Sequence, residues 1–294
     1  MARHTFLLPF VGAVCLAAAP SPPCPPVPEP RPTELVSSAG DFTLPTADEF
    51  GRLARTDPIA MLDAARRRFR AEVKTYRATL VKQERVAGTL NPPEEILIAG
   101  REEPFAVLLL WRTGARSVFG FPVEGTLFAA GENNGKMVVW RPAALLRTID
   151  IPPTDGQARA ASRYSVAEAG LYHAVDRTYR AWEAARHRGR FSCEYLGTRP
   201  VASVGGRVCH VVRRTCDPPE LDAFASTDPP PDADSRPADA HKTITVTVDA
   251  ETWLQVGSEL RRADGELVGV YDFRDVELNP SFTPTQFKTT SLKK

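Results

Sequence analysis

The sequence lacks an excess of charge of either sign, which narrows the range of its partners. It has 37 lysines and arginines against 36 aspartates and glutamates, a formal net charge of +1 at pH 7. Proteins that bind nucleic acids need a basic surplus to displace counterions from the phosphates. Arg66, Arg67, Arg68 and Arg70 form a local basic run, which we interpret as the solvated face of a helix. We therefore expect no nucleic-acid partner.

The chain also lacks the short motifs that carry catalysis. It contains no G-x-S-x-G nucleophile elbow, no H-E-x-x-H zinc motif and no Walker phosphate-binding loop. The carboxylate pairs Glu94-Glu95 and Glu102-Glu103 adjoin prolines at the expected ends of strands, where charged residues protect sheet edges. We expect no catalytic residues, no enzymatic activity and no cofactor.

Long apolar runs are missing after the start of the chain, so no second membrane-spanning segment is expected. Near the start, Arg3 precedes an almost unbroken apolar stretch, Thr5 to Ala19, of the length of a signal-peptide core. Residues 1–19 are interpreted as a signal peptide or an uncleaved N-terminal anchor. Lipidation at Cys15 is disfavoured because Val14 precedes it where a small residue is required. These features predict export to the periplasm or cell envelope, with a membrane surface nearby.

Proline is abundant, and its distribution divides the chain. Of the 27 prolines, many lie in residues 20–32, where such a density favours an extended polyproline conformation. We interpret residues 20–48 as a stiff tether and residues 49–290 as a single domain. A second stretch rich in proline and aspartate, at about 217–240, is poor in core-forming residues and is predicted to be a disordered insertion.

Five cysteines are present, and their spacing favours no metal site. Export permits disulfides, and Cys209 with Cys216 is the nearest pair and the candidate bond. His210 adjoins Cys209, and His187 precedes Cys193, but neither forms the paired spacing typical of zinc ligands. We therefore predict no bound metal.

Two helices are indicated by capping residues. Asp57-Pro58 reads as an N-cap followed by proline at the first helical position. Ser165-Val166-Ala167-Glu168 matches a capping box, and Gly189 suits the helix end that follows. Both segments carry an apolar stripe at helical spacing, so each helix is expected to cover an apolar surface.

The remaining segments alternate like strands. The dipeptides Asn134-Gly135 and Asp264-Gly265 predict hairpins between successive strands. The run Phe105 to Trp111 is apolar at both odd and even positions, so this strand is expected to be central and covered on both faces. In Thr243 to Val248, isoleucine and valine alternate with threonine. Strands that follow one another without intervening helices favour an antiparallel sheet.

Several segments resemble a bacterial exported family known as domain of unknown function 1571. They are the strand beginning Tyr76-Arg77-Ala78-Thr79-Leu80, the turn Glu132-Asn133-Asn134-Gly135-Lys136, the helix start Ser165 to Leu171, and the closing Tyr271-Asp272-Phe273-Arg274 run that ends at Asn279-Pro280. The chain is also similar in general pattern to lipoprotein-carrier domains of the LolA/LolB type. The resemblance implies an α+β fold, a curved antiparallel half-barrel whose concave face is covered by helices and holds acyl chains.

This resemblance suggests an exported, monomeric protein that binds a lipid, a lipoprotein or another apolar ligand. The expected lining is aromatic and aliphatic: Val107, Leu109, Trp111, Trp140 and Trp253. The alternative is a structural or protein-interaction module of the envelope, with the same fold packed solid.

Overall fold

The computed structural model describes residues 43–222 and 239–293. The expected signal segment, nearly all of the tether, and residues 223–238 of the insertion lie outside the described residues. Within the described ranges, no helix is both long enough and apolar enough to cross a membrane. The helices are α1 (Ala47–Thr56), α2 (Pro58–Glu72), α3 (Gly156–Ala161) and α4 (Leu171–His187), with short 3-10 turns η1 (Asn133–Gly135), η2 (Val166–Glu168), η3 (Ala202–Val204) and η5 (Thr289–Lys293).

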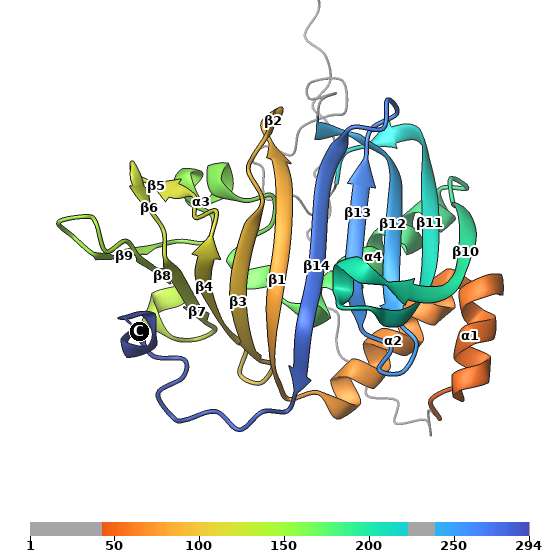
Figure 1. Ribbon diagram of the computed structural model, residues 1–294, viewed down its shortest axis with the longest axis horizontal. Helices are drawn as coiled ribbons and strands as arrows, with labels where there is room; N and C mark the ends of the chain where they lie inside the picture. Colours follow the sequence, from red (N-terminus) through yellow and green to blue (C-terminus); the bar gives the residue numbers. More distant parts are fainter. Residues whose placement is uncertain (1–42, 223–238, 294) are drawn as a thin grey trace, which may run out of the picture. The chain divides into compact units, whose positions relative to one another are not determined.

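One antiparallel sheet of twelve strands organises the domain (Figure 1). Its path runs β10-β11-β12-β13-β14-β1-β3-β4-β7-β8-β9, with β2 paired to β1, and β5 with β6 forms a separate ribbon. The sheet does not close, and the predicted α+β fold with a curved antiparallel sheet is confirmed. The strands are β1 (Thr75–Val86), β2 (Thr89–Leu90), β3 (Glu94–Arg101), β4 (Ala106–Thr113), β5 (Ser117–Val118), β6 (Phe121–Pro122), β7 (Gly125–Ala129), β8 (Met137–Trp140), β9 (Thr148–Ile151), β10 (Ser192–Val201), β11 (Arg207–Glu220), β12 (His241–Asp249), β13 (Gln255–Arg261) and β14 (Leu267–Leu278).

The long strand β1 joins the two halves of the sheet. It pairs with β14 on one side and with β3 on the other, so that Leu80 lies between Phe273 and Ile96. The last strand, β14, thus pairs with the first, β1. This pairing places strands from both ends of the domain around one shared face.

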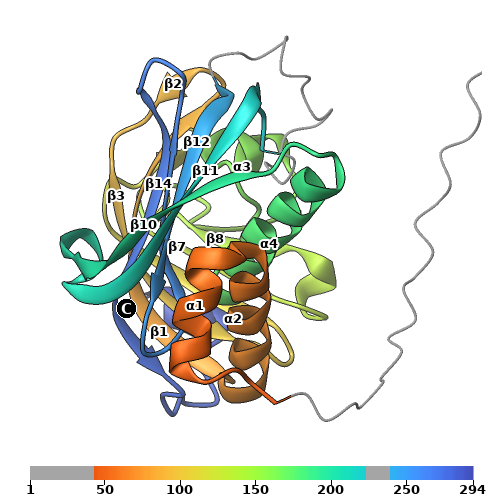
Figure 2. The same ribbon diagram turned by 90° about the vertical axis from the view of Figure 1, so that its right-hand side faces the viewer.

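Helices α1, α2 and α4 lie on the same side of the sheet, which we call the inner face (Figure 2). Under α1 and α2 the face is packed solid, because Phe50, Ile59 and Leu62 join a cluster that includes Val212 and Val246. All five side chains are almost fully buried. This packing fixes the two helices on the β10–β13 half of the sheet.

The opposite, outer face of the other half is covered by the C-terminal segment. Phe287 and Leu292 pack with Leu108 of β4, Leu127 of β7 and Val138 of β8. The neighbouring β4 residues Val107 and Leu109 belong instead to the inner-face cluster. The prediction that this strand is covered on both faces is therefore confirmed.

Helix α2 begins as predicted, whereas α4 does not. The Asp57 carboxylate accepts a hydrogen bond from the Ala60 N–H at 3.1 Å, with Pro58 in the first turn. Ser165 caps only the 3-10 turn η2, and α4 starts at Leu171 after Gly170, which has φ 110°. A single helix from Ser165 is therefore wrong, because the positive φ at Gly170 interrupts it. Helix α1 was not predicted from the sequence.

Both predicted hairpins are present. Strands β7 and β8 pair antiparallel around the Asn134-Gly135 turn, and both residues have positive φ. Strands β13 and β14 pair around Asp264-Gly265, where the Arg262 N–H donates to the Glu266 carbonyl at 2.8 Å. Residues 217–220 of the predicted insertion belong to β11.

Candidate functional site

A cavity of about 550 Å³ separates the inner face of the sheet from α3, η2 and α4. Its floor spans both halves of the sheet, from β8 across β1 and β14 to β11. Apolar side chains make up much of this floor: Leu80, Ile96, Leu109, Met137, Val139, Leu260 and Phe273 from the strands, and Val123 from the turn before β7.

Many of the residues that cover the cavity are small, which contributes to the space beneath them, although the larger Tyr164, Arg177 and Trp182 also line it. An alanine side chain is too short to fill this space, whereas the Ser162 hydroxyl reaches Glu84 of β1 at 3.3 Å. Well-packed interiors leave few voids larger than a water molecule, so a cavity of this size reflects the choice of residues along the cover. The small residues are Ala158, Ala161, Ser162, Ser165, Ala169, Gly170, Ala174, Thr178, Ala181 and Ala184.

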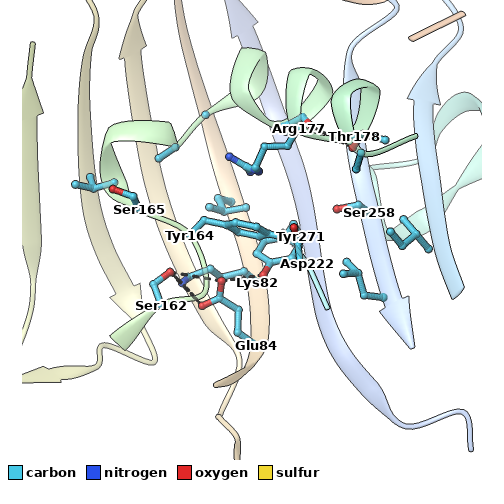
Figure 3. A pocket seen from close by; sticks show the side chains of 18 of the residues that line it. Lys82, Glu84, Ser162, Tyr164, Ser165, Arg177, Thr178, Asp222, Ser258 and Tyr271 are labelled. Atoms are coloured by element: carbon cyan, nitrogen blue, oxygen red, sulfur yellow. Dashed lines mark hydrogen bonds and ion pairs between the residues drawn. The ribbon is translucent and has the colours of Figure 1, made fainter. Parts of the chain in front are cut away.

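A buried ion cluster stands on the floor of the cavity (Figure 3). The Lys82 ammonium lies 2.8 Å from a Glu84 oxygen and 3.5 Å from a Glu94 oxygen. The Trp111 indole N–H donates to Glu94 at 2.7 Å, and Arg116 Nε lies 3.4 Å from the same carboxylate. The side chains of Lys82, Glu84 and Glu94 are all buried, so each charge depends on the others for compensation.

Glu84 collects further hydrogen bonds. The Tyr271 hydroxyl donates to it at 2.9 Å, and the Ser162 hydroxyl lies 3.3 Å away. Burial raises the pKa of Glu84, but the charge and hydrogen bond of Lys82, the Tyr271 hydroxyl and the Arg163 charge outweigh it, so its pKa lies below the ordinary value. Burial lowers the pKa of Lys82, but Glu84 and Glu94 outweigh that, so its pKa lies above the ordinary value. Both groups are therefore charged at neutral pH, and a protonated lysine is not a nucleophile.

A second polar group adjoins the cluster. Tyr164 donates its hydroxyl to Asp222, its ring stands 5.4 Å from the Tyr271 ring, and the Arg177 guanidinium lies 4.2 Å above it. Figure 3 shows Arg177 of α4 above these tyrosines, with Thr178 beside it above Ser258. These polar residues thus form one connected group in the lining of the cavity.

The five residues predicted to bind ligand fall into three places. Leu109 and Trp111 line the cavity, and Val107 is buried in the inner-face cluster beside them. Trp140 packs against the outer-face cluster, and Trp253 stacks on Phe50 at 4.2 Å under α1. The structure thus brings two of the five to the cavity, and their ligand-binding role stays a prediction.

The candidate disulfide does not form. Cys209 and Cys216 lie in the same strand, β11, and all three described cysteines are free thiols. Seven residues of strand separate the two cysteines by about 23 Å, whereas the Cα atoms of a disulfide are usually no more than about 7 Å apart. The prediction failed because no turn separates the two positions.

Sequence reasoning missed the ion cluster, although a signal was present. Lys82 and Glu84 share the alternation of Tyr76, Ala78 and Leu80, the buried side of β1. Two charged residues at successive positions on the buried side of a strand indicate that each is buried together with an oppositely charged partner.

The fold and the cavity define an open antiparallel sheet that encloses a ligand-sized space beneath helices. The family described as "Protein of unknown function (DUF1571)" matches residues 73–293, and the chain belongs to this family. The resemblance found in the sequence is thereby confirmed. The chain has no match among curated proteins.

Several solved structures are similar at low identity. Lipoprotein LppX of Mycobacterium tuberculosis is 12% identical with a TM-score of 0.41, over 77% of this chain and 98% of that one. MucB in the Pseudomonas aeruginosa MucA/MucB complex is 14% identical with a TM-score of 0.40, over 84% and 61% of the chains. The LolA superfamily protein NE2245 of Nitrosomonas europaea is 7% identical with a TM-score of 0.30, over 78% and 98%.

Proposed function

We propose that this protein is an exported envelope protein that binds one amphiphilic ligand with an acyl chain in the cavity. The observation that carries the proposal is the pairing of an apolar strand floor with a cover of small residues, which leaves about 550 Å³. This volume falls within the usual range for small-molecule sites. Each methylene buried there would contribute about 0.8 kcal/mol.

The lining also favours a ligand with acceptor oxygens. Arg116 Nη2 and Trp182 Nε1 are buried donors that have no hydrogen-bond acceptor in the described part of the chain, and both residues line the cavity. Buried donors usually have a partner. An ester, carboxylate or phosphate group of a bound lipid would supply one.

The charge of the lining suggests an acidic head group. Seven lysines and arginines line the cavity against three acidic residues, an excess of four positive charges. Arg188 and Arg190 at its edge are exposed and make no ion pair within the described ranges. A head group bearing a carboxylate or phosphate would complement them.

Native mass spectrometry tests this proposal on the mature protein purified from its own envelope fraction, followed by lipid extraction. We expect close to one acyl species per chain, and its head group should be acidic. A protein that is free of ligand as purified, and stays so after incubation with lipids, would overturn the proposal.

A substitution in the cavity floor tests whether the ligand binds there. Leu109→Asp places a carboxylate on the apolar floor, and we expect it to abolish the uptake of a fluorescent acyl probe. Circular dichroism establishes that the variant folds. Unchanged uptake by a folded variant would contradict binding at this floor.

A second candidate function, a protein-interaction module of the envelope, is favoured by an exposed apolar tip. Leu145 and Leu146 are 98% and 70% exposed, and Phe119 and Phe121 are exposed too. Arg141 connects them, since its guanidinium donates to the Val118 and Leu146 carbonyls. If this function holds, a Leu145→Ser, Leu146→Ser double variant loses captured partner proteins while ligand occupancy is unchanged.

A further inference from the structure

Three potential metal ligands meet where β11 joins β12. Ligand atoms of Cys216, Glu220 and His241 all lie within 4.8 Å of one another. The pairing register explains the meeting: β11 advances from Thr215 to Glu220 while β12 moves only from Thr243 to His241. The extra residues of β11 bulge out, so that Cys216 and Glu220 both face one histidine.

The histidine of this group is buried without a partner. His241 is only 2% exposed, and its Nδ1 makes no hydrogen bond within the described ranges. Buried polar atoms nearly always have a partner, and leaving one without destabilises the folded state. Cys216 beside it is fully buried. A bound ion would satisfy the imidazole nitrogen.

We propose that Cys216, Glu220 and His241 bind one divalent transition metal ion, with zinc the best fit. Sulfur, nitrogen and carboxylate oxygen together are the ligand set that zinc accepts. Zinc bonds of about 2.0–2.3 Å place tetrahedral ligand atoms about 3.3–3.8 Å apart, so small side-chain rotations complete the site.

Arg163, Arg214 and Lys242 act electrostatically on the cluster, and Arg214 also orients one of its ligands. Arg214 Nη2 donates to Glu220 Oε2 at 2.8 Å, which orients the carboxylate and leaves its other oxygen for the metal. A hydrogen-bonded carboxylate of this kind is typical of the layer around metal ligands. A Cys216 thiolate and the Glu220 carboxylate balance the ion's two charges.

A further thiol, outside the three proposed ligands, lies on the neighbouring strand. Cys193 of β10 pairs with Arg214, and so lies on the same face of the sheet as Cys216, two residues along. We predicted no metal from the sequence, because Cys216, Glu220 and His241 come from two strands and show none of the short spacings typical of zinc sites. Only the strand register brings them together.

The ion would have a structural role. Cys216 and Glu220 precede the connection between β11 and β12, and His241 follows it. One ion would therefore hold together the two ends of this connection, at the edge of the cavity, where Glu220 and His241 also form part of the lining.

Cobalt spectroscopy on the full chain tests the proposal, because thiolate ligation of Co²⁺ gives a charge-transfer absorption. We expect one Co²⁺ per chain, displaced by Zn²⁺, and a rise in melting temperature with Zn²⁺. His241→Ala and Glu220→Gln should each weaken binding by about tenfold or more, and Cys216→Ser should remove the thiolate absorption.

The matched control is Cys209→Ser, which alters a buried cysteine of the same strand outside the cluster. It should keep both the absorption and the zinc-dependent melting shift. The proposal is overturned if the wild-type protein shows no thiolate absorption. It is also overturned if the absorption survives in folded His241→Ala and Cys216→Ser proteins.

Discussion

Two regions of the same inner face differ in how they are filled. Under α1 and α2, large side chains such as Phe50, Ile59 and Leu62 interlock with the strands and leave a solid core. Under α3, η2 and α4, many of the covering residues are alanines and serines, and a cavity lies between them and the strands. The comparison shows that the sheet alone does not decide whether a pocket exists. The size of the covering residues decides it.

The two regions also differ in polarity. The core of the solid region is a cluster of apolar side chains, whereas the cavity floor carries the Lys82–Glu84–Glu94 cluster. A charged cluster in this position is stable because each charge has a partner, and removing one partner leaves the others uncompensated. The cavity region therefore depends on electrostatic balance, and the solid region depends on packing.

The largest expected effect comes from breaking that balance. Lys82→Met keeps the length of the side chain but removes the cation that Glu84 and Glu94 share, so that Glu84 loses its ion-pair partner and Glu94 keeps only Arg116. We expect a loss of about 3–5 kcal/mol in the free energy of unfolding at pH 7. Urea denaturation measures it, and a loss below about 1 kcal/mol would show that the cluster is hydrated rather than buried.

Packing in the solid region gives the next largest effect. Leu62→Ala should cost about 2–5 kcal/mol, since Leu62 is enclosed on all sides. Leu109→Ala should cost about half as much, because Leu109 faces the cavity and has fewer contacts to lose. Equal losses in the two urea titrations would contradict the difference between the regions.

A smaller effect concerns pH. The lowered pKa of Glu84 means that its stabilising contribution is complete above its unfolded value of about 4.5 and is lost as pH falls below it. The raised pKa of Lys82 means that its contribution is complete below about 10.5 and is lost as pH rises above it. The wild-type contribution is therefore constant between these values.

The stability of the Lys82→Met variant should depend on pH differently from that of the wild type. In Lys82→Met, Glu84 has lost its cation, and protonation relieves the buried charge. The stability deficit of the variant relative to the wild type should therefore narrow from pH 7 to pH 4. A deficit that is constant over this interval would argue against a charged Glu84.

Much of the fold was predictable from the sequence. Alternation in Thr243 to Val248, the two-faced apolar run around Leu109 and the Asp57 cap each depend on local chemistry, and the structure bears them out. The start of α4 was not predictable from its capping pattern. Gly170 has a φ of 110°, and Tyr76 packs so closely against it that a side chain there would collide with the Tyr76 hydroxyl, a contact that depends on the tertiary structure.

The site was only partly predictable. Leu109 and Trp111 reach the cavity because their strand was correctly identified, while Trp140 lies in a strand whose alternation directs it to the outer face. The cavity itself depends on which small residues of 158–184 face the sheet. That information comes from tertiary packing, although the excess of alanine there is visible in the sequence.

The most direct test of the account fills the cavity from its cover and measures acyl-probe binding. Ala161 lines the cavity, and its neighbour Ala160 is exposed, so Ala161→Leu and Ala160→Leu form a matched pair in α3. The account predicts that Ala161→Leu weakens binding by about tenfold or more without loss of stability, while Ala160→Leu binds like the wild type. Equal binding by both folded variants would contradict the claim that the space beneath the small-residue cover holds the ligand.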